Sequence, residues 1–165
     1  MTDKLLKLDR IDVLILAELQ TNGRISNNEL AERVHLSASP CLQRVRKLEN
    51  AGYITSYGAH LSVAKLGDPQ VVFTQVTLGS HTREDFLRFE KILSSHDELV
   101  EAHLVSGGFD YLLKFVTLNI ARYQALIDDL LASDAGIEKY FSFIVLRSPI
   151  VKHHLPLQKL LNPAS

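Results

Sequence analysis

Residues 26–52 read SNNELAERVHLSASPCLQRVRKLENAG, and this stretch decides the fold of the first third of the chain. Its first four residues match a capping box, in which the Glu29 amide donates to the Ser26 hydroxyl and the Ser26 amide donates to the Glu29 carboxylate. A helix therefore begins here. Apolar residues follow at helical spacing up to Val34, and the helix ends near His35.

The second half of the stretch predicts another helix after a tight turn. Ser37 or Ser39 caps its start, and Pro40 is tolerated in the first turn because the amide that proline lacks has no helical partner there. Gly52 ends the helix in the left-handed conformation that favours glycine. The expected inward face consists of Cys41, Leu42, Val45 and Leu48, and the outward face of Gln43, Arg44, Arg46, Lys47 and Asn50.

A third helix is predicted before these two, over residues 8–20. Its apolar residues recur at helical spacing and are Leu8, Ile11, Ile15 and Leu19. Asn22-Gly23 ends it. The first part of the chain is therefore expected to be a bundle of three short helices.

The charge of the chain is distributed unevenly along the first part. The whole chain carries 18 basic and 19 acidic side chains, a net charge of −1, which argues against a protein that binds polyanions. The segment from Arg33 to Lys47, however, holds four basic residues and no acidic one. A phosphate backbone would dock at this segment.

Two short helices joined by a tight turn, with the second basic and exposed, are typical of the helix-turn-helix, which lays its second helix in the major groove of DNA. Small residues at the start of that helix allow close approach to a phosphate, and Gln43 can pair with adenine. The predicted DNA-binding residues are Ser37, Ser39, Gln43, Arg44, Arg46 and Lys47. The alternative from the pattern alone is a three-helix bundle whose charges are only solvated.

The rest of the chain predicts an α+β domain with the element order β-α-β-β-α-β. The expected strands are 71–78, 99–106, 111–117 and 137–146, and the expected helices are 82–93 and 120–131. This order is typical of the ferredoxin-like fold, an antiparallel sheet with both helices on one face. The apolar residues available for the other face are Phe73, Leu112, Phe115, Phe141 and Phe143. Two subunits are expected to pair through that face.

A short strand at 53–61 and a boundary at Ala64–Pro69 separate the two parts. We therefore expect a helix-turn-helix domain over residues 1–60, a linker over 61–69, a ferredoxin-like domain over 70–150 and a C-terminal tail over 151–165.

Three motifs stand in order along the chain: LDRID at 8–12, SASPCLQRVRKLE at 37–49 and SGGFDY at 106–111. Together with GIEKYFSFIVLRSP at 136–149, they resemble the Lrp/AsnC family of transcription regulators over nearly the whole chain. The resemblance implies a winged helix-turn-helix, a ferredoxin-like sensing domain and dimers that often assemble into octamers. It also implies that a small molecule, typically a free amino acid, tunes the binding of double-stranded DNA.

In the family the effector lies between subunits, near the hairpin that here spans Gly107–Asp110. The roles that the resemblance implies are Asp110 for the ammonium group, the amides of Gly107 and Gly108 for the carboxylate, Phe109 as a wall and Ser142 as a hydroxyl. Gly108 and Phe143 depart from the family pattern, in which an acidic or amide side chain and a second hydroxyl are common. The identity of the effector is therefore left open.

Several classes of protein are disfavoured. No motif of a hydrolase or nucleotide-binding enzyme occurs, so we expect no catalysis and no cofactor. The seven histidines show no ligand spacing, which argues against a metal site, and Cys41 is expected to be packed as a small apolar residue. Without a long apolar run or a signal sequence, we expect a cytoplasmic protein that does not enter membranes.

The runner-up function is a ligand-sensing module that regulates a partner protein through the N-terminal helices. Such an interface would carry exposed apolar side chains, whereas the predicted outward face of the second helix-turn-helix helix is hydrophilic. DNA is therefore the favoured partner.

Overall fold

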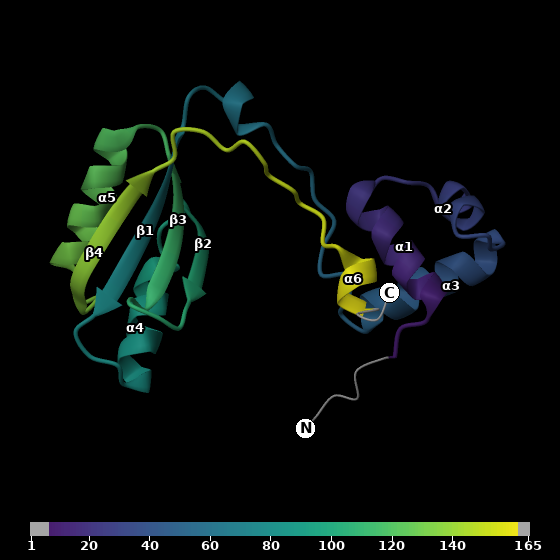
Figure 1. Cartoon of the computed structure of the whole chain (residues 1–165), viewed down its shortest axis with the longest axis horizontal. Helices are drawn as coiled ribbons and strands as arrows, with labels where there is room; N and C mark the ends of the chain where they lie inside the picture. Colours follow the sequence, from purple (N-terminus) through teal and green to yellow (C-terminus); the bar gives the residue numbers. More distant parts are fainter. Residues whose placement is uncertain (1–6, 162–165) are drawn as a thin grey trace. The chain divides into compact units, whose positions relative to one another are not determined.

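A computed structural model describes residues 7–161, and the chain divides into two compact units (Figure 1). One unit consists of Met1–His60 together with Ile150–Ser165, and the other of Leu61–Pro149. The described part of the chain has no helix that combines the length and the apolar character needed to cross a bilayer.

The first unit contains the three predicted helices, α1 (Arg10–Thr21), α2 (Asn27–Arg33) and α3 (Ala38–Asn50). Asp9 caps α1 in a capping box with Asp12. Ser26 caps α2 as predicted, accepting from the Glu29 amide at 3.2 Å. The predicted hydrogen bond from the Ser26 amide to the Glu29 carboxylate is wrong, because that carboxylate pairs with Arg33 at 2.7 Å.

The turn between α2 and α3 depends on one residue with a positive φ. His35 has a φ of 57°, which non-glycine residues seldom adopt, and the next amide, that of Leu36, donates to the Ala31 carbonyl at 2.8 Å. After α3, Gly52 has a φ of 74° and the Tyr53 amide donates to the Leu48 carbonyl at 3.0 Å. The predicted glycine cap is confirmed.

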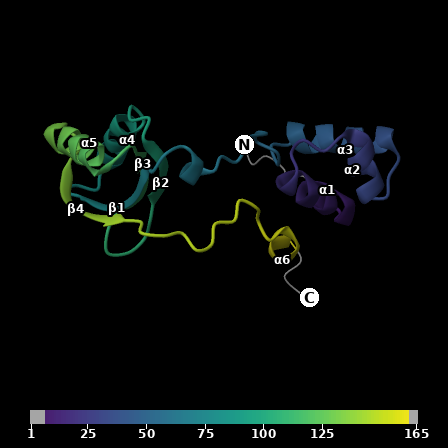
Figure 2. The same cartoon turned by 90° about the horizontal axis from the view of Figure 1, so that it is seen from above.

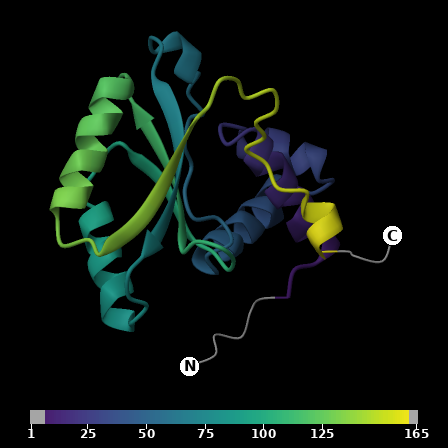
Figure 3. The same ribbon diagram turned by 60° about the vertical axis from the view of Figure 1, so that its left-hand side comes forward.

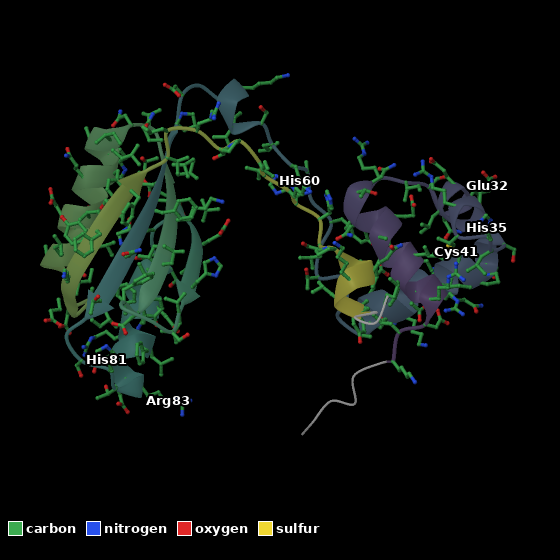
Figure 4. All side chains as sticks on the ribbon, in the orientation of Figure 1. Glu32, His35, Cys41, His60, His81 and Arg83 are labelled. Carbon is green, nitrogen blue, oxygen red and sulfur yellow. The ribbon has the colours of Figure 1, made fainter. Side chains whose placement is uncertain are left out.

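A small apolar core joins the three helices and consists of Ile15, Leu16, Leu30, Ala31, Val34, Cys41 and Leu48. Cys41 is fully buried, as predicted, and burial raises the pKa of its thiol (Figure 4). Leu42 was expected to point inward, and this prediction is wrong, since the side chain is 38% exposed.

The strand predicted at 53–61 is also wrong, because no residue of this segment is in a strand. Tyr53 and Ile54 pack against the helical core, and the residues from Thr55 to Leu61 are exposed without a neighbouring strand to pair with in the described structure. A strand needs such a partner for its backbone hydrogen bonds.

The segment from Ile150 on belongs to the first unit and contains a short helix, α6 (Leu157–Leu161). Leu157 packs against the three-helix core. The Gln20 side chain exchanges two hydrogen bonds with the Leu155 backbone, of 3.0 and 2.9 Å, and His60 stacks on His153 with ring centroids 4.2 Å apart. Residues far apart in sequence therefore complete this unit.

The second unit has the predicted βαββαβ order. A single 3-10 turn, η1 (Val63–Lys65), precedes the elements β1 (Gln70–Leu78), α4 (Arg83–Leu93), β2 (Leu99–Leu104), β3 (Tyr111–Thr117), α5 (Ile120–Ala132) and β4 (Ile137–Ile144). The sheet order is β2-β3-β1-β4, and all neighbouring strands are antiparallel. The α+β, ferredoxin-like fold class is confirmed.

Both helices cover the same face of the sheet (Figures 2 and 3). The core between them and the sheet includes Val72, Phe89, Tyr111 and Phe115. Phe115 was expected on the other face, and this prediction is wrong because the residue is fully buried under the helices. Phe73, Leu112, Phe141 and Phe143 do share the open face, as the strand register requires.

Candidate nucleic-acid interface and effector site

The outer face of α3 carries most of the predicted DNA-binding residues. Ser37 is the N-cap residue of α3 and its hydroxyl makes no capping hydrogen bond, so it stays available to a ligand. The side chains of Ser39, Gln43, Arg46 and Lys47 are exposed along the helix. A small, polar N-terminus followed by an amide and two cations matches the groups that contact phosphates and base edges.

Arg44 lies elsewhere on α3, half-buried against the start of α1. Its Nη1 atom donates to Asp9 Oδ2 and to Asp12 Oδ1, each at 2.7 Å. Asp12 is only 2% exposed. The Asp12 amide, followed by the Arg44 guanidinium, lowers the pKa of the Asp9 carboxyl. The two carboxylates in turn raise the pKa of Arg44.

Arg33 is paired as well, with Glu18 at 2.9 Å and with Glu29 at 2.7 Å. The segment from Arg33 to Lys47 contains no acid, but two of its four basic residues, Arg33 and Arg44, therefore form ion pairs with acids from α1, its N-cap and α2. Arg46 and Lys47 have no acidic partner within the described residues 7–161. The free positive charge of the interface is concentrated on these two.

The position of Arg44 was detectable from helix geometry. It stands three residues after Cys41 and four before Leu48, both fully buried, so the three share one side of the helix. Leu42, predicted on the inward face, is exposed, and Arg44, predicted on the outward face, lies half-buried beside Cys41 and Leu48. Its partners Asp12 and Asp9 lie 32 and 35 residues earlier, and no local pattern in the sequence predicts their contact with Arg44.

The predicted effector hairpin connects β2 and β3. A Cβ atom added to Gly107 or Gly108 would meet no heavy atom within 4 Å, so open space surrounds both glycines. Gly107 has a φ of 152°, which favours glycine. Phe109 is half-buried beside them. Exposed amides at such a turn can hold an anionic group.

Asp110 is held by contacts within the second unit. Its Oδ2 atom accepts from the Leu78 amide at 2.8 Å, and its Oδ1 atom lies 3.0 Å from His81 Nε2. Its side chain is 17% exposed. His81, beside the start of α4, is a residue that the sequence analysis missed (Figure 4). The two residues are 29 positions apart, and nothing in the local sequence pairs them.

Ser142 lies away from the hairpin. It pairs with Thr74 in the sheet, whereas the hairpin begins beyond the pairing of Val76 with Tyr111. The Ser142 hydroxyl bonds the Tyr123 hydroxyl, which also bonds Thr74 at 2.7 Å. It borders a hollow of about 420 Å³ lined by Ile120, Tyr123, Gln124, Ile127, Asp128, Tyr140, Ser142 and Ile144. One chain therefore does not bring Ser142 and the hairpin together.

Two protein-family models match the chain. One covers residues 8–55 and describes a winged helix-turn-helix DNA-binding domain. The other covers residues 71–154 and describes the Lrp/AsnC ligand-binding domain. The chain belongs to the Lrp/AsnC family. Its predicted function as a DNA-binding transcription regulator with a ligand-sensing domain is confirmed at that level.

Similar proteins of this Lrp/AsnC family are known in several bacteria. The chain is 47% identical over 143 residues to the transcriptional regulatory protein DoeX of Halomonas elongata, covering 87% of this chain and 90% of that protein. It is 42% identical over 139 residues to the leucine-responsive regulatory protein of Escherichia coli, covering 84% and 85%. Both similarities span the two units.

A solved structure of a transcriptional regulator from Neisseria meningitidis in complex with L-Met has a TM-score of 0.86 and 34% identity to this Lrp/AsnC protein. The similarity covers 94% of this chain and all of that one. DoeX and the Neisseria protein are both named as transcriptional regulators. Within residues 7–161, no three His, Cys, Asp or Glu side chains are arranged to hold a metal ion.

Proposed function

We propose that this Lrp/AsnC regulator binds duplex DNA through the outer face of α3 and changes its DNA affinity when an amino acid binds at the β2–β3 hairpin. The observation that carries the DNA part is the exposed polar face of α3, on which Arg46 and Lys47 have no acidic partner among the described residues. A regulator of a partner protein would instead need an apolar face there.

On DNA, each part of this face has its own role. Ser37 and Ser39 leave the N-terminal amides of α3 open to a phosphate, and Gln43 reads adenine in the major groove. Arg46 and Lys47 bind phosphates or a guanine edge.

The effector part rests on the hairpin and on the relatives. The amides of Gly107 and Gly108 bind the carboxylate of the amino acid, Asp110 its ammonium group, and Phe109 the side chain. Ser142 enters the site from a different subunit, because one chain holds it away from the hairpin. The naming of one relative as leucine-responsive and the binding of L-Met by another support an amino-acid effector.

A second copy of the chain covers the open face of the sheet. Phe141 and Phe143 are each 51% exposed there, beside Phe73 and Leu112. An exposed aromatic patch of this kind is typical of an interface between subunits, and face-to-face pairing places two α3 helices in one particle. Such dimers then assemble further, to octamers.

The DNA part is tested with fluorescence anisotropy on labelled duplexes over a series of salt concentrations. Lys47→Ala removes one phosphate contact, so the slope of log affinity against log salt falls by about 0.9. Gln43→Ala weakens sequence preference and leaves the slope unchanged. If neither variant differs from the wild type, α3 does not contact DNA.

The effector part is tested by the melting temperature of the full chain with each of the twenty free amino acids. A ligand that binds the folded protein raises that temperature. Asp110→Asn keeps an oxygen for the Leu78 amide but removes the charge that pairs with ammonium, so it should abolish the rise above the variant's own ligand-free melting temperature. An undiminished rise in Asp110→Asn would place the amino acid elsewhere.

A further inference from the structure

We propose that Arg44 is a positioning residue, which fixes the rotation of α3 on α1 and does not itself contact DNA. This inference rests on the proposed binding of DNA by α3. It concerns three residues, Arg44, Asp9 and Asp12, which we term the Arg44 triad.

The hydrogen bonds of the Arg44 triad leave no carboxylate oxygen without a partner. Asp9 Oδ1 accepts from the Asp12 amide at 2.9 Å, and Asp12 Oδ2 accepts from the Asp9 amide at 3.1 Å. The two remaining oxygens, Asp9 Oδ2 and Asp12 Oδ1, both accept from Arg44 Nη1 at 2.7 Å. The guanidinium therefore pairs with both carboxylates of the capping box that starts α1.

The burial of Asp12 makes it costly to break the contact between Asp12 and Arg44. Asp12 is 2% exposed, and a buried carboxylate is costly unless a cation and hydrogen bonds accompany it. If Arg44 turned outward to a phosphate, it would leave the Asp12 charge buried without its cation. A phosphate contact by Arg44 would also bring the DNA backbone close to two carboxylates.

The triad holds α3 at its middle, and a second polar contact holds its first turn. The Asn27 side-chain amide donates to the Ala38 carbonyl at 2.8 Å. Gln43 lies next to Arg44, and Lys47 lies almost one turn beyond it, so a rotation of α3 would move both away from the groove. Such a rotation would weaken specific contacts more than non-specific attraction, since the latter depends on net charge.

The experiment uses the full chain and a duplex that the wild-type protein selects from a random-sequence pool, with a scrambled duplex for comparison. The decisive variant is Asp12→Asn, which makes the protein one charge more positive. We expect Asp12→Asn and Arg44→Met each to lower affinity for the selected duplex about tenfold, and affinity for the scrambled duplex much less. Neither should change the salt slope, whereas Lys47→Ala should lower it by about 0.9.

Rescue separates positioning from contact. Arg44→Met combined with Asp12→Asn removes the buried charge of Asp12 together with the cation that pairs with it, so the double variant should melt above Arg44→Met and bind the selected duplex more tightly than Arg44→Met does. All variants are compared below their melting temperatures, so that only folded protein is assayed. The proposal is overturned if Asp12→Asn binds as tightly as the wild type or tighter, while Arg44→Met lowers the salt slope and is not rescued.

If α3 does not bind DNA at all, the same experiment gives a different result. In that case the wild type selects no duplex from the pool, and Lys47→Ala binds like the wild type. The DNA role of the Arg44 triad would then be rejected together with the proposed function, whereas rejection of the triad alone leaves wild-type selection and the Lys47→Ala effect intact.

Discussion

The two units of this regulator are stabilised in different ways. In the first unit, a core of small and aliphatic side chains is surrounded by ion pairs that join one helix to another, such as Arg33 with Glu18 and Arg44 with Asp12. In the second, the core is larger and contains aromatic contacts, such as Phe89 with Tyr111 at 4.8 Å between ring centroids. The second unit has ion pairs as well, such as Lys114 with Glu101, but its core is larger, so ion pairs between helices contribute a larger share of the stability of the first unit.

The largest effect on the second unit is expected from the removal of an aromatic side chain in its core. Phe115→Ala deletes a fully buried ring that meets Tyr123 edge-on, with centroids 5.8 Å apart, and should destabilise the second unit by about 3–5 kcal/mol. Hydrogen exchange should show lost protection in β1 and β3, with protection of α1–α3 kept. Leu87→Ala, at a 55% exposed side chain on α4, is the control. Equal loss in both units would mean that they unfold as one body.

The corresponding change in the first unit is Arg44→Met. It leaves the buried Asp12 carboxylate without its cation, and because Arg44 itself is 31% exposed we expect a loss of about 2 kcal/mol, below that of a fully buried pair. Hydrogen exchange of the backbone amides of α1 and α3 measures this loss of stability. Arg46→Met changes an exposed residue of the same helix and should cost less than about 0.5 kcal/mol. A similar cost for both variants would contradict the role of ion pairs in this unit.

A smaller effect is expected from the polar group inside the second unit. Tyr123→Phe removes the hydroxyl that bonds Thr74 at 2.7 Å and leaves the fully buried Thr74 hydroxyl without that partner. The expected cost is about 1 kcal/mol, measured by denaturant unfolding. Tyr57→Phe removes a hydroxyl from an exposed side chain in the first unit and should cost less. The opposite order would show that buried hydroxyls contribute little here.

Acid should act on the first unit through Asp9, with the smallest effect. The pKa of Asp9 is lowered in the folded chain, so its contribution to stability is complete above the ordinary value of 3.8 and is lost as the pH falls through the lower folded value. Asp9→Asn should therefore lower the melting temperature at pH 7 and have no effect in strong acid. Glu32→Gln, at an exposed acid of α2, provides the comparison. A difference that persists unchanged in strong acid would exclude this ion pair as its cause.

Local signals predicted the elements of both units well. The Ser26 cap of α2 and the left-handed Gly52 after α3 depend only on neighbouring residues, so the local sequence is enough to predict them. The failures involve distant partners. The acids that meet Arg44, the packing of α6 on α1 and the approach of His81 to Asp110 join residues that only the folded chain brings together. The expected strand at 53–61 failed because local propensity cannot supply a pairing strand.

The return of residues 150–161 to the first unit has a consequence for synthesis on the ribosome. The second unit, Leu61–Pro149, is complete before Leu155 and Leu157 emerge, although α1–α3 were made first. Residues 150–161 of the first unit are therefore translated after the whole of the second unit. Until then, the three helices made first lack the residues that contact Gln20 and cover one side of α1.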